Sequence, residues 1–316
     1  MKARAQQKPA PQQLPASMYR LSILFACLCA LWLAACRERT GCEALLDYRD
    51  GEYIDRVNDL IEAGELAAAI RLNDEALRYN PRNYMALSNR GALRFEQKRH
   101  YLTRDELSCV LNDLEGALLI CPNYVIGTNN LMTIGAEFGL FNQVINAAKL
   151  RDSLVGGLST YHRTKLLIAY YHSGYDTLAI RVGESVLRDA PAYTDAANYL
   201  ALTYVRQRQY PRGQSLLEGV VKDGRADALT YYALGELHRT QEHFLLAGFY
   251  YNESVRLDPK HYDAILALAR LRERQENYSE ACSNYQLAEA NCRGIFGYRY
   301  EQAAVRRKIE TLCGPG

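Results

Sequence analysis

The stretch that decides the fold lies near the C-terminus, where residues 228–261 read ALTYYALGELHRTQEHFLLAGFYYNESVRLDPKH and residues 262–292 read YDAILALARLRERQENYSEACSNYQLAEANC. When Ala228 is aligned with Tyr262, small and aromatic positions coincide in the pairs Gly235 and Ala269, Ala247 and Ala281, Tyr251 and Tyr285, and Ser254 and Ala288. Small residues at such places allow two helices to approach to about 8–10 Å. The spacing therefore predicts a pair of helices that recurs about every 34 residues and stacks on its neighbours.

The same marks continue backward toward residue 50. Proline ends a helix because it cannot donate the next hydrogen bond, and prolines stand just after the predicted second helix of four units, at Pro81, Pro122, Pro191 and Pro259. Glycine stands at the turn between the two helices of three units, at Gly64, Gly139 and Gly174. We place the units at residues 50–83, 84–124, 125–159, 160–193, 194–227, 228–261 and 262–297. Extra residues near 98–104 indicate a longer loop in the second unit.

With these marks in this order, the chain resembles the tetratricopeptide-repeat (TPR) family. The resemblance implies an all-α, right-handed superhelical solenoid of about seven helix-turn-helix repeats. We expect the array to occupy residues 50–297, with a capping helix and tail at 298–316 and a short N-terminal tether at 36–49. The alternative is a generic helical bundle in which the spacing is accidental, because alanine and leucine are common in any helix.

The N-terminus carries a second informative stretch, residues 21–36, which read LSILFACLCALWLAAC. The run follows Arg20, is shorter than the ~20 residues that span a bilayer, and has the pattern of a secretory signal. Its end, residues 33–36, resembles the lipobox of bacterial lipoproteins. That resemblance implies cleavage of residues 1–35, diacylglycerol attachment to the Cys36 thiol, and acylation of the new amine, for example by palmitate. The alternative is an ordinary signal peptide or an uncleaved anchor.

Two further expectations concern this leader. The segment before Met18 is long and polar for a signal peptide, so translation starting at Met18 is our hypothesis. The residue after Cys36 is Arg37; in lipoproteins an aspartate there favours retention in the inner membrane, and its absence favours the outer membrane. The resemblance thus implies a lipid-anchored protein of the bacterial outer membrane that faces the periplasm.

The charge of the chain argues against nucleic acid as a partner. Four of the 38 basic residues precede Cys36, and the 34 that follow stand against 36 acidic residues, which makes the net charge of that part −2. Phosphate binding requires a clustered basic surface. We therefore expect protein or peptide partners and no nucleic acid.

Six cysteines remain beyond the predicted lipid site: Cys42, Cys109, Cys121, Cys282, Cys292 and Cys313. An even number in an exported protein permits disulfides, and 15 connectivities are possible for six cysteines. Cys109 and Cys121 lie twelve residues apart on one predicted helix, about 18 Å, so these two cannot pair with each other. The alternative is that the cysteines are buried packing residues.

No motif for catalysis, metal binding or cofactor binding is present. The sequence lacks HExxH, Gly-x-Ser-x-Gly, GxxxxGK and GxGxxG, and no CxxC pair stands with His at zinc-ligand spacing. His238 and His243 are five residues apart, which does not place them on one helical face as ligands. We therefore expect a protein that is not an enzyme and that requires no metal and no cofactor.

In the TPR family the inner wall of the solenoid is formed by the first helix of each repeat. The resemblance maps that wall onto Tyr171, Asn198, Arg206, Tyr232, Arg239 and Arg270. Tyr and Arg are over-represented among binding hot spots, and the Asn198 amide offers a donor and an acceptor to a peptide backbone. These residues form the predicted partner-binding groove; the alternative is that they are solvated helix faces.

The functional hypothesis is a membrane-anchored scaffold or adaptor of the bacterial cell envelope that binds polypeptides in its concave groove. The alternative is an outer-membrane lipoprotein that captures a ligand or a glycan. Lipoproteins of that second kind carry long inserts that bear the binding site, whereas the insert near residues 98–104 is short.

Overall fold

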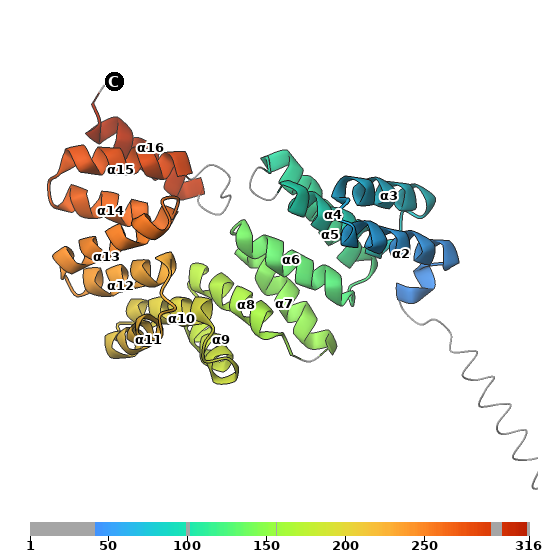
Figure 1. Ribbon diagram of the computed structural model, residues 1–316, viewed down its shortest axis with the longest axis horizontal. Helices are drawn as coiled ribbons and strands as arrows, with labels where there is room; N and C mark the ends of the chain where they lie inside the picture. Colours follow the sequence, from blue (N-terminus) through green and yellow to red (C-terminus); the bar gives the residue numbers. More distant parts are fainter. Residues whose placement is uncertain (1–41, 99–101, 156, 292–298, 315–316) are drawn as a thin grey trace, which may run out of the picture. The chain divides into compact units, whose positions relative to one another are not determined.

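The computed structural model describes residues 42–98, 102–155, 157–291 and 299–314, and within them every regular element is a helix (Figure 1). The chain divides into two compact units, Met1–Asp47 and Tyr48–Gly316. The first contains a short 3-10 helix, η1 (Cys42–Leu45). The second contains the α-helices α2 (Tyr48–Glu62), α3 (Leu66–Tyr79), α4 (Tyr84–Lys98), α5 (Arg104–Ile120), α6 (Val125–Glu137), α7 (Phe141–Val155), α8 (Thr160–His172), α9 (Asp176–Asp189), α10 (Thr194–Arg206), α11 (Tyr210–Lys222), α12 (Ala228–Thr240), α13 (Phe244–Leu257), α14 (Tyr262–Arg274), α15 (Tyr278–Asn291) and α16 (Arg299–Leu312).

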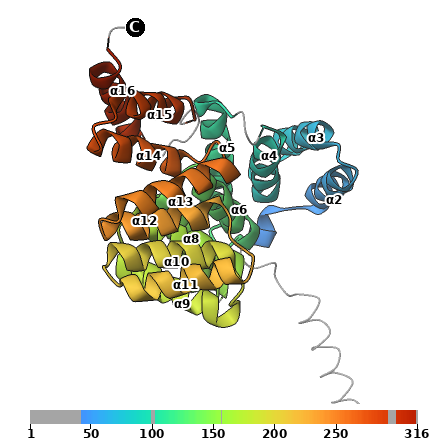
Figure 2. The same ribbon diagram turned by 60° about the vertical axis from the view of Figure 1, so that its left-hand side comes forward.

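Consecutive helices of the second unit pack in pairs, from α2 with α3 to α14 with α15, and α16 packs on α15. The first helices of the middle pairs also touch, from α4 with α6 to α10 with α12. Figure 2 shows α8, α10 and α12 side by side. This arrangement confirms the predicted fold class, an all-helical repeat solenoid with a final capping helix.

The small residues of the repeat lie where the sequence pattern placed them. Ala247 and Ala281 have no exposed surface. A Cβ atom on Gly235 would lie 2.4 Å from two ring carbons of Tyr251, so the ring packs directly against the backbone of α12. Tyr251 is itself fully buried. Glycine is therefore required at position 235 by the close approach of α12 and α13.

The turns between the paired helices require a left-handed backbone conformation. Gly174 has φ 76°, but the equivalent turns of the next three hairpins have Arg208, Glu242 and Glu276 at φ 57°, 64° and 63°. A side chain in this region costs about 1–2 kcal/mol relative to glycine. The predicted longer loop lies between α4 and α5, partly outside the described residues, and Thr103 closes it with a capping box on α5.

The C-terminal end of the array is held by a hydrophobic cluster and a disulfide. Val305 of α16 packs in one cluster with Ile265 and Leu266 of α14 and Tyr285 of α15. Cys282 forms a disulfide with Cys313 across a separation of 31 residues. The last helix is thereby bonded covalently to the hairpin that precedes it.

Candidate functional site

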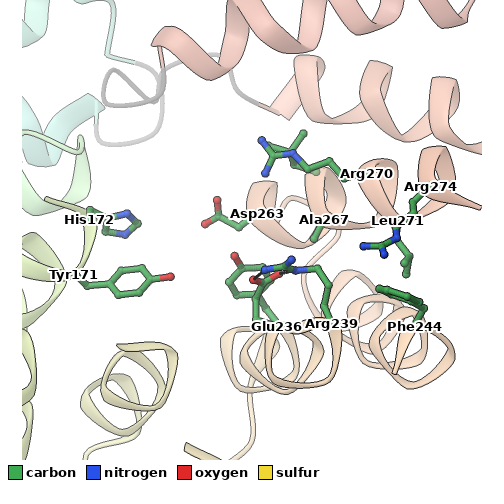
Figure 3. Close-up of a pocket in the computed structure, with 12 residues that line it drawn as sticks. Tyr171, His172, Glu236, Arg239, Phe244, Asp263, Ala267, Arg270, Leu271 and Arg274 are labelled. Atoms are coloured by element: carbon green, nitrogen blue, oxygen red, sulfur yellow. Dashed lines mark hydrogen bonds and ion pairs between the residues drawn. The ribbon is translucent and has the colours of Figure 1, made fainter. Parts of the chain in front are cut away.

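A cavity of about 410 Å³ opens among the first helices of the C-terminal repeats (Figure 3). Three first helices, α8, α12 and α14, and the start of α13 contribute its lining. The lining combines tyrosine, arginine, carboxylate and apolar side chains: Tyr171, His172, Tyr232, Glu236, Arg239, Phe244, Asp263, Leu266, Ala267, Arg270, Leu271 and Arg274.

On α12, Tyr232, Glu236 and Arg239 face the cavity because positions i, i+4 and i+7 share one side of a helix. Arg239 donates two hydrogen bonds to Glu236, Nε to Oε1 at 2.9 Å and Nη2 to Oε2 at 2.6 Å. The hydroxyl of Tyr251 also donates to Glu236. The hydrogen bond to Glu236 raises the pKa of Arg239, and both charges of α12 are therefore satisfied within the protein.

On α14, the residues that line the cavity run from Asp263 near its first turn to Arg274 at its last residue. The guanidinium carbon of Arg274 lies 4.2 Å from the ring centroid of Phe244, within cation–π range. Leu271 and Ala267 are buried and supply an apolar floor between the charged groups. The cavity therefore presents a cationic group on an aromatic ring beside a hydrophobic surface.

On α8, Tyr171 and His172 point toward Asp263 across the open space in Figure 3. The imidazole of His172 stacks on Phe141, with ring centroids 4.5 Å apart. Burial and, secondarily, the charge of Arg206 lower the pKa of His172 to about 4. His172 is therefore neutral at neutral pH and presents an uncharged polar ring to the cavity.

The tyrosines around Asp263 are protonated and act as hydrogen-bonding groups. Burial raises the pKa of Tyr171 to about 12, and burial also raises the pKa values of Tyr199 and Tyr232. The charge of Asp263 contributes to all three shifts, and the Tyr171 and Tyr199 rings meet edge-on at 5.6 Å. This end of the cavity is thus aromatic and anionic.

Four of the six predicted groove residues line this cavity, namely Tyr171, Tyr232, Arg239 and Arg270. Arg206 lies beside it: its guanidinium stacks over Tyr171 at 4.2 Å, donates to the Tyr171 carbonyl at 2.8 Å, and forms an ion pair with Asp176. Arg206 therefore positions Tyr171 and joins α10 to the start of α9.

Asn198 is a correction to the predicted groove. Its side chain has no exposed surface, and its Nδ2 donates to Asp227 at 3.0 Å, the residue that caps α12. Asn198 thus joins two successive repeats from inside the packed layer. The prediction that it faces an open wall is wrong, because its side chain is buried and bonded to the residue that caps the first helix of the next repeat.

Asp263 and Phe244 were missed by the sequence analysis. Asp263 stands seven residues before Arg270, so helical spacing placed it on the same face and was a usable signal. Phe244 begins a second helix rather than a first one, and nothing in the repeat pattern assigns that position to the inner wall.

The cysteines divide into bonded and free. Besides the Cys282–Cys313 bridge, Cys42 and Cys121 are each disulfide-bonded, whereas Cys109 is an exposed free thiol. The prediction that Cys109 and Cys121 do not pair is confirmed. Cys292 and the predicted lipid site Cys36 lie outside the described residues.

Metal sites and membrane spans are both missing from the described part of the chain. No group of three or more His, Cys, Asp or Glu side chains there is arranged to hold a metal ion. No helix within the same ranges is long and apolar enough to cross a membrane.

Comparison with known proteins supports the repeat assignment. A sequence model of the tetratricopeptide repeat matches residues 54–100 and 198–261. A tetratricopeptide-repeat protein from Parabacteroides merdae superposes with a TM-score of 0.67 at 15% identity, over 84% of this chain and 99% of that one. Yeast Tom70 superposes with a TM-score of 0.49 at 13% identity, over 78% of this chain and 58% of that one. MamA from Desulfovibrio magneticus superposes with a TM-score of 0.39 at 20% identity, over 54% of this chain and 95% of that one.

No curated protein matches the sequence. At this level of identity the likeness to the Parabacteroides protein shows the fold alone. The first matched segment runs from α2 through α4, and the second runs from α10 through α13. The chain therefore contains tetratricopeptide repeats in these two segments, and its other helices pair in the same way.

Proposed function

We propose that this protein is a non-catalytic scaffold that binds a segment of a partner protein in the cavity formed by α8, α12 and α14. The observation that carries the proposal is the lining itself. Tyrosine and arginine side chains from three first helices converge on one opening, and these residue types dominate the energetics of protein interfaces when they become desolvated. Their arrangement also matches the use of the inner surface in repeat solenoids.

The size and polarity of the cavity fit a few side chains of an extended segment. Cavities that hold small ligands are mostly apolar with few polar groups, whereas this lining carries three arginines and two carboxylates. Polar groups spread along two adjacent helices suit a polypeptide, which offers a regular series of donors and acceptors.

A photo-crosslinking experiment tests this proposal. A benzophenone amino acid is placed at position 270, which is exposed and lines the cavity, and in a matched protein at position 249. Phe249 lies on α13, is 57% exposed and does not line the cavity. We expect a defined protein adduct from position 270 in cells and none of the same mass from position 249. Adducts from position 249 alone would contradict the proposal.

The location of the scaffold is a second part of the proposal. Residues 33–36 match a lipobox, which supports cleavage before Cys36, a lipid anchor on that residue, and a site of action at the periplasmic face of a bacterial outer membrane. Two or more acyl chains hold a protein firmly at a membrane, whereas one holds it marginally.

Fractionation of a Cys36→Ser variant tests the anchor. We expect the variant to leave the outer-membrane fraction and to keep an unprocessed leader, because both cleavage and lipid attachment require the thiol. A Cys109→Ser variant is the control, since that thiol is free and exposed. A Cys36→Ser protein that still sediments with outer membranes in high salt contradicts the anchor.

A further inference from the structure

The two C-terminal repeats carry opposite charges at equivalent positions of their first helices. When the two repeats are aligned, Glu236 corresponds to Arg270 and Arg239 corresponds to Glu273. In both repeats a buried tyrosine of the second helix donates to the carboxylate of the first: Tyr251 to Glu236, and Tyr285 to Glu273 at 2.6 Å. The carboxylate that accepts the tyrosine hydrogen bond therefore stands one helical turn later in α14 than in α12.

This reversal decides which charge reaches the cavity. On α12 both members of the pair, Glu236 and Arg239, line it and are bonded to each other. On α14, Glu273 does not line the cavity and forms an ion pair with Lys308 of the capping helix. Arg270 takes the position on the cavity side, where its exposed side chain lines the cavity.

Arg274 adds a second cation one turn further along the same face. Its guanidinium carbon lies over the Phe244 ring, 4.2 Å from the ring centroid. Stacking uses the face of a guanidinium, whereas its N–H donors point outward in the plane, in the fork geometry that matches a carboxylate. Among the described residues no carboxylate forms an ion pair with Arg274. Its charged neighbours in the chain are both paired, Arg272 with Glu280 and Glu273 with Lys308.

The anionic end of the cavity is too far away to neutralise Arg274. Asp263 stands eleven residues before it on α14, which is about 16 Å along the helix. This separation exceeds the Debye length of about 8 Å at physiological ionic strength. The partial negative charge at the C-terminus of α14 opposes an anion there, but it amounts to only about half a charge against the full charge of the guanidinium.

We propose that the Arg270–Arg274 end of the cavity recognises an acidic side chain that stands next to a large apolar side chain in the partner segment; this rests on the proposed scaffold function. The carboxylate meets the in-plane donors of Arg274 with Arg270 beside it. The apolar neighbour packs on Leu271, Ala267 and the free edge of Phe244. The recognised group is a side chain, so the ends of the partner chain are not required.

Fluorescence anisotropy with short labelled peptides of blocked termini tests the proposal. The probe alternates two glutamates with phenylalanine and leucine, and two control peptides carry glutamine or lysine in place of both glutamates. We expect the acidic probe to bind at least about tenfold more tightly than the glutamine peptide, and to weaken as salt is raised. The lysine peptide is expected to bind least.

Variants of the full-length protein assign the effect to its residues. Arg274→Gln should weaken the acidic probe about tenfold, and Arg274→Lys should recover only part of the loss because lysine lacks the planar fork. Arg272→Gln is the matched control: it removes the same charge from the same helix, but Arg272 pairs with Glu280 and does not line the cavity. Circular dichroism confirms that each variant is folded.

The outcomes separate this inference from the scaffold function. Equal affinity for the acidic and glutamine peptides, no binding of the acidic probe at millimolar concentration, or equal losses in Arg274→Gln and Arg272→Gln would overturn it. A protein adduct at position 270 together with any of these results leaves the scaffold function standing and removes only the preference for acidic segments. The absence of a protein adduct at position 270 would contradict the proposed scaffold function itself.

Discussion

Two sides of the same helix, α12, follow different rules. On one side Gly235 packs against the fully buried Tyr251, and a small residue, Ala269, stands at the equivalent position of the next repeat. On the other side Glu236 and Arg239 line the cavity, and their charges are reversed at the equivalent positions of α14. The residues of the packed side recur because the two helices of every hairpin must approach closely, which requires small residues at the same positions. The residues of the open side have no such requirement and can differ between repeats.

This difference separates stability from recognition. Changes on the packed side are expected to lower the free energy of unfolding, and changes on the open side are expected to alter binding while the fold is kept. The predictions below test that separation, beginning with the largest effect on stability.

Removal of the Cys282–Cys313 disulfide, which bonds the capping helix to the last hairpin, is expected to have the largest effect on stability. A Cys282→Ser, Cys313→Ser double variant should lose about 3 kcal/mol of unfolding free energy, because the bridge closes a loop of 31 residues. Denaturant titration of the oxidised wild type and the variant measures the loss. Cys109→Ser, which removes a free exposed thiol, should shift the midpoint very little; a comparable shift there would contradict the assignment.

Gly235→Ala is expected to cost about 2 kcal/mol, since the new Cβ would lie 2.4 Å from the buried Tyr251 ring. The matched change is Gly248→Ala on α13, whose Cβ would lie 3.3 Å from the tip of Leu271 alone. A flexible side chain can yield, and alanine favours the helix by about 1 kcal/mol, so this variant should be neutral or more stable. Thermal melts of both proteins decide; equal changes would show that the α12–α13 contact is not close.

His172 should make stability depend on pH on the open side. Its folded pKa is about 4, below the ordinary value of about 6.5, so the unfolded chain binds the proton first. The stability it contributes is complete above pH 6.5 and is lost as the pH falls toward 4. Between pH 7 and 5 the loss is about 1–2 kcal/mol, and His172→Gln should remove it from the difference between melts at the two pH values. An unchanged difference would contradict the burial of this ring.

The turns between paired helices should give the smallest effect. Glu242 has φ 64°, a conformation in which glycine is favoured over other residues. Glu242→Gly should raise the unfolding free energy by less than about 1 kcal/mol, because the gain is partly offset by the greater freedom of glycine in the unfolded chain. Gly174→Ala, at φ 76°, should move the melting temperature in the opposite direction. A fall in stability for Glu242→Gly would show that its side chain contributes more than the strain costs.

The fold was predictable from sequence because its determinants are local and repeated. Ala247 and Ala281 are fully buried, where a larger side chain would not fit, and prolines such as Pro259 mark the ends of second helices. These positions therefore form a recognisable pattern among otherwise varied residues. The cavity was only partly predictable. Helical spacing identifies Tyr232 and Arg239, but it does not reveal which neighbour covers a face, and Asn198 on α10 is buried against the start of the next repeat.

Ion pairs and cation–π contacts between distant residues were the second feature that could not be predicted from the sequence. Arg206 was predicted to bind a partner directly, and the structure shows it stacked on Tyr171 and paired with Asp176. The residues of such a pair stand 30 positions apart in the chain, and no periodic mark connects them. The role of Phe244 beneath Arg274 likewise depends on a contact between two different hairpins, which the sequence of either hairpin alone does not contain.

The central claim is that the cavity lined by α8, α12 and α14 is the surface on which a partner protein binds. It is tested most directly by one paired measurement on an Arg270→Ala, Arg274→Ala variant: its thermal melt, and the quantity of partner that it recovers from cells relative to the wild type. The account predicts a change in stability within about 0.5 kcal/mol, as for exposed substitutions, and at least a tenfold loss of partner. Arg256→Ala with Arg272→Ala, outside the cavity, should keep full recovery. Unchanged folding with unchanged recovery in the cavity variant would contradict the claim.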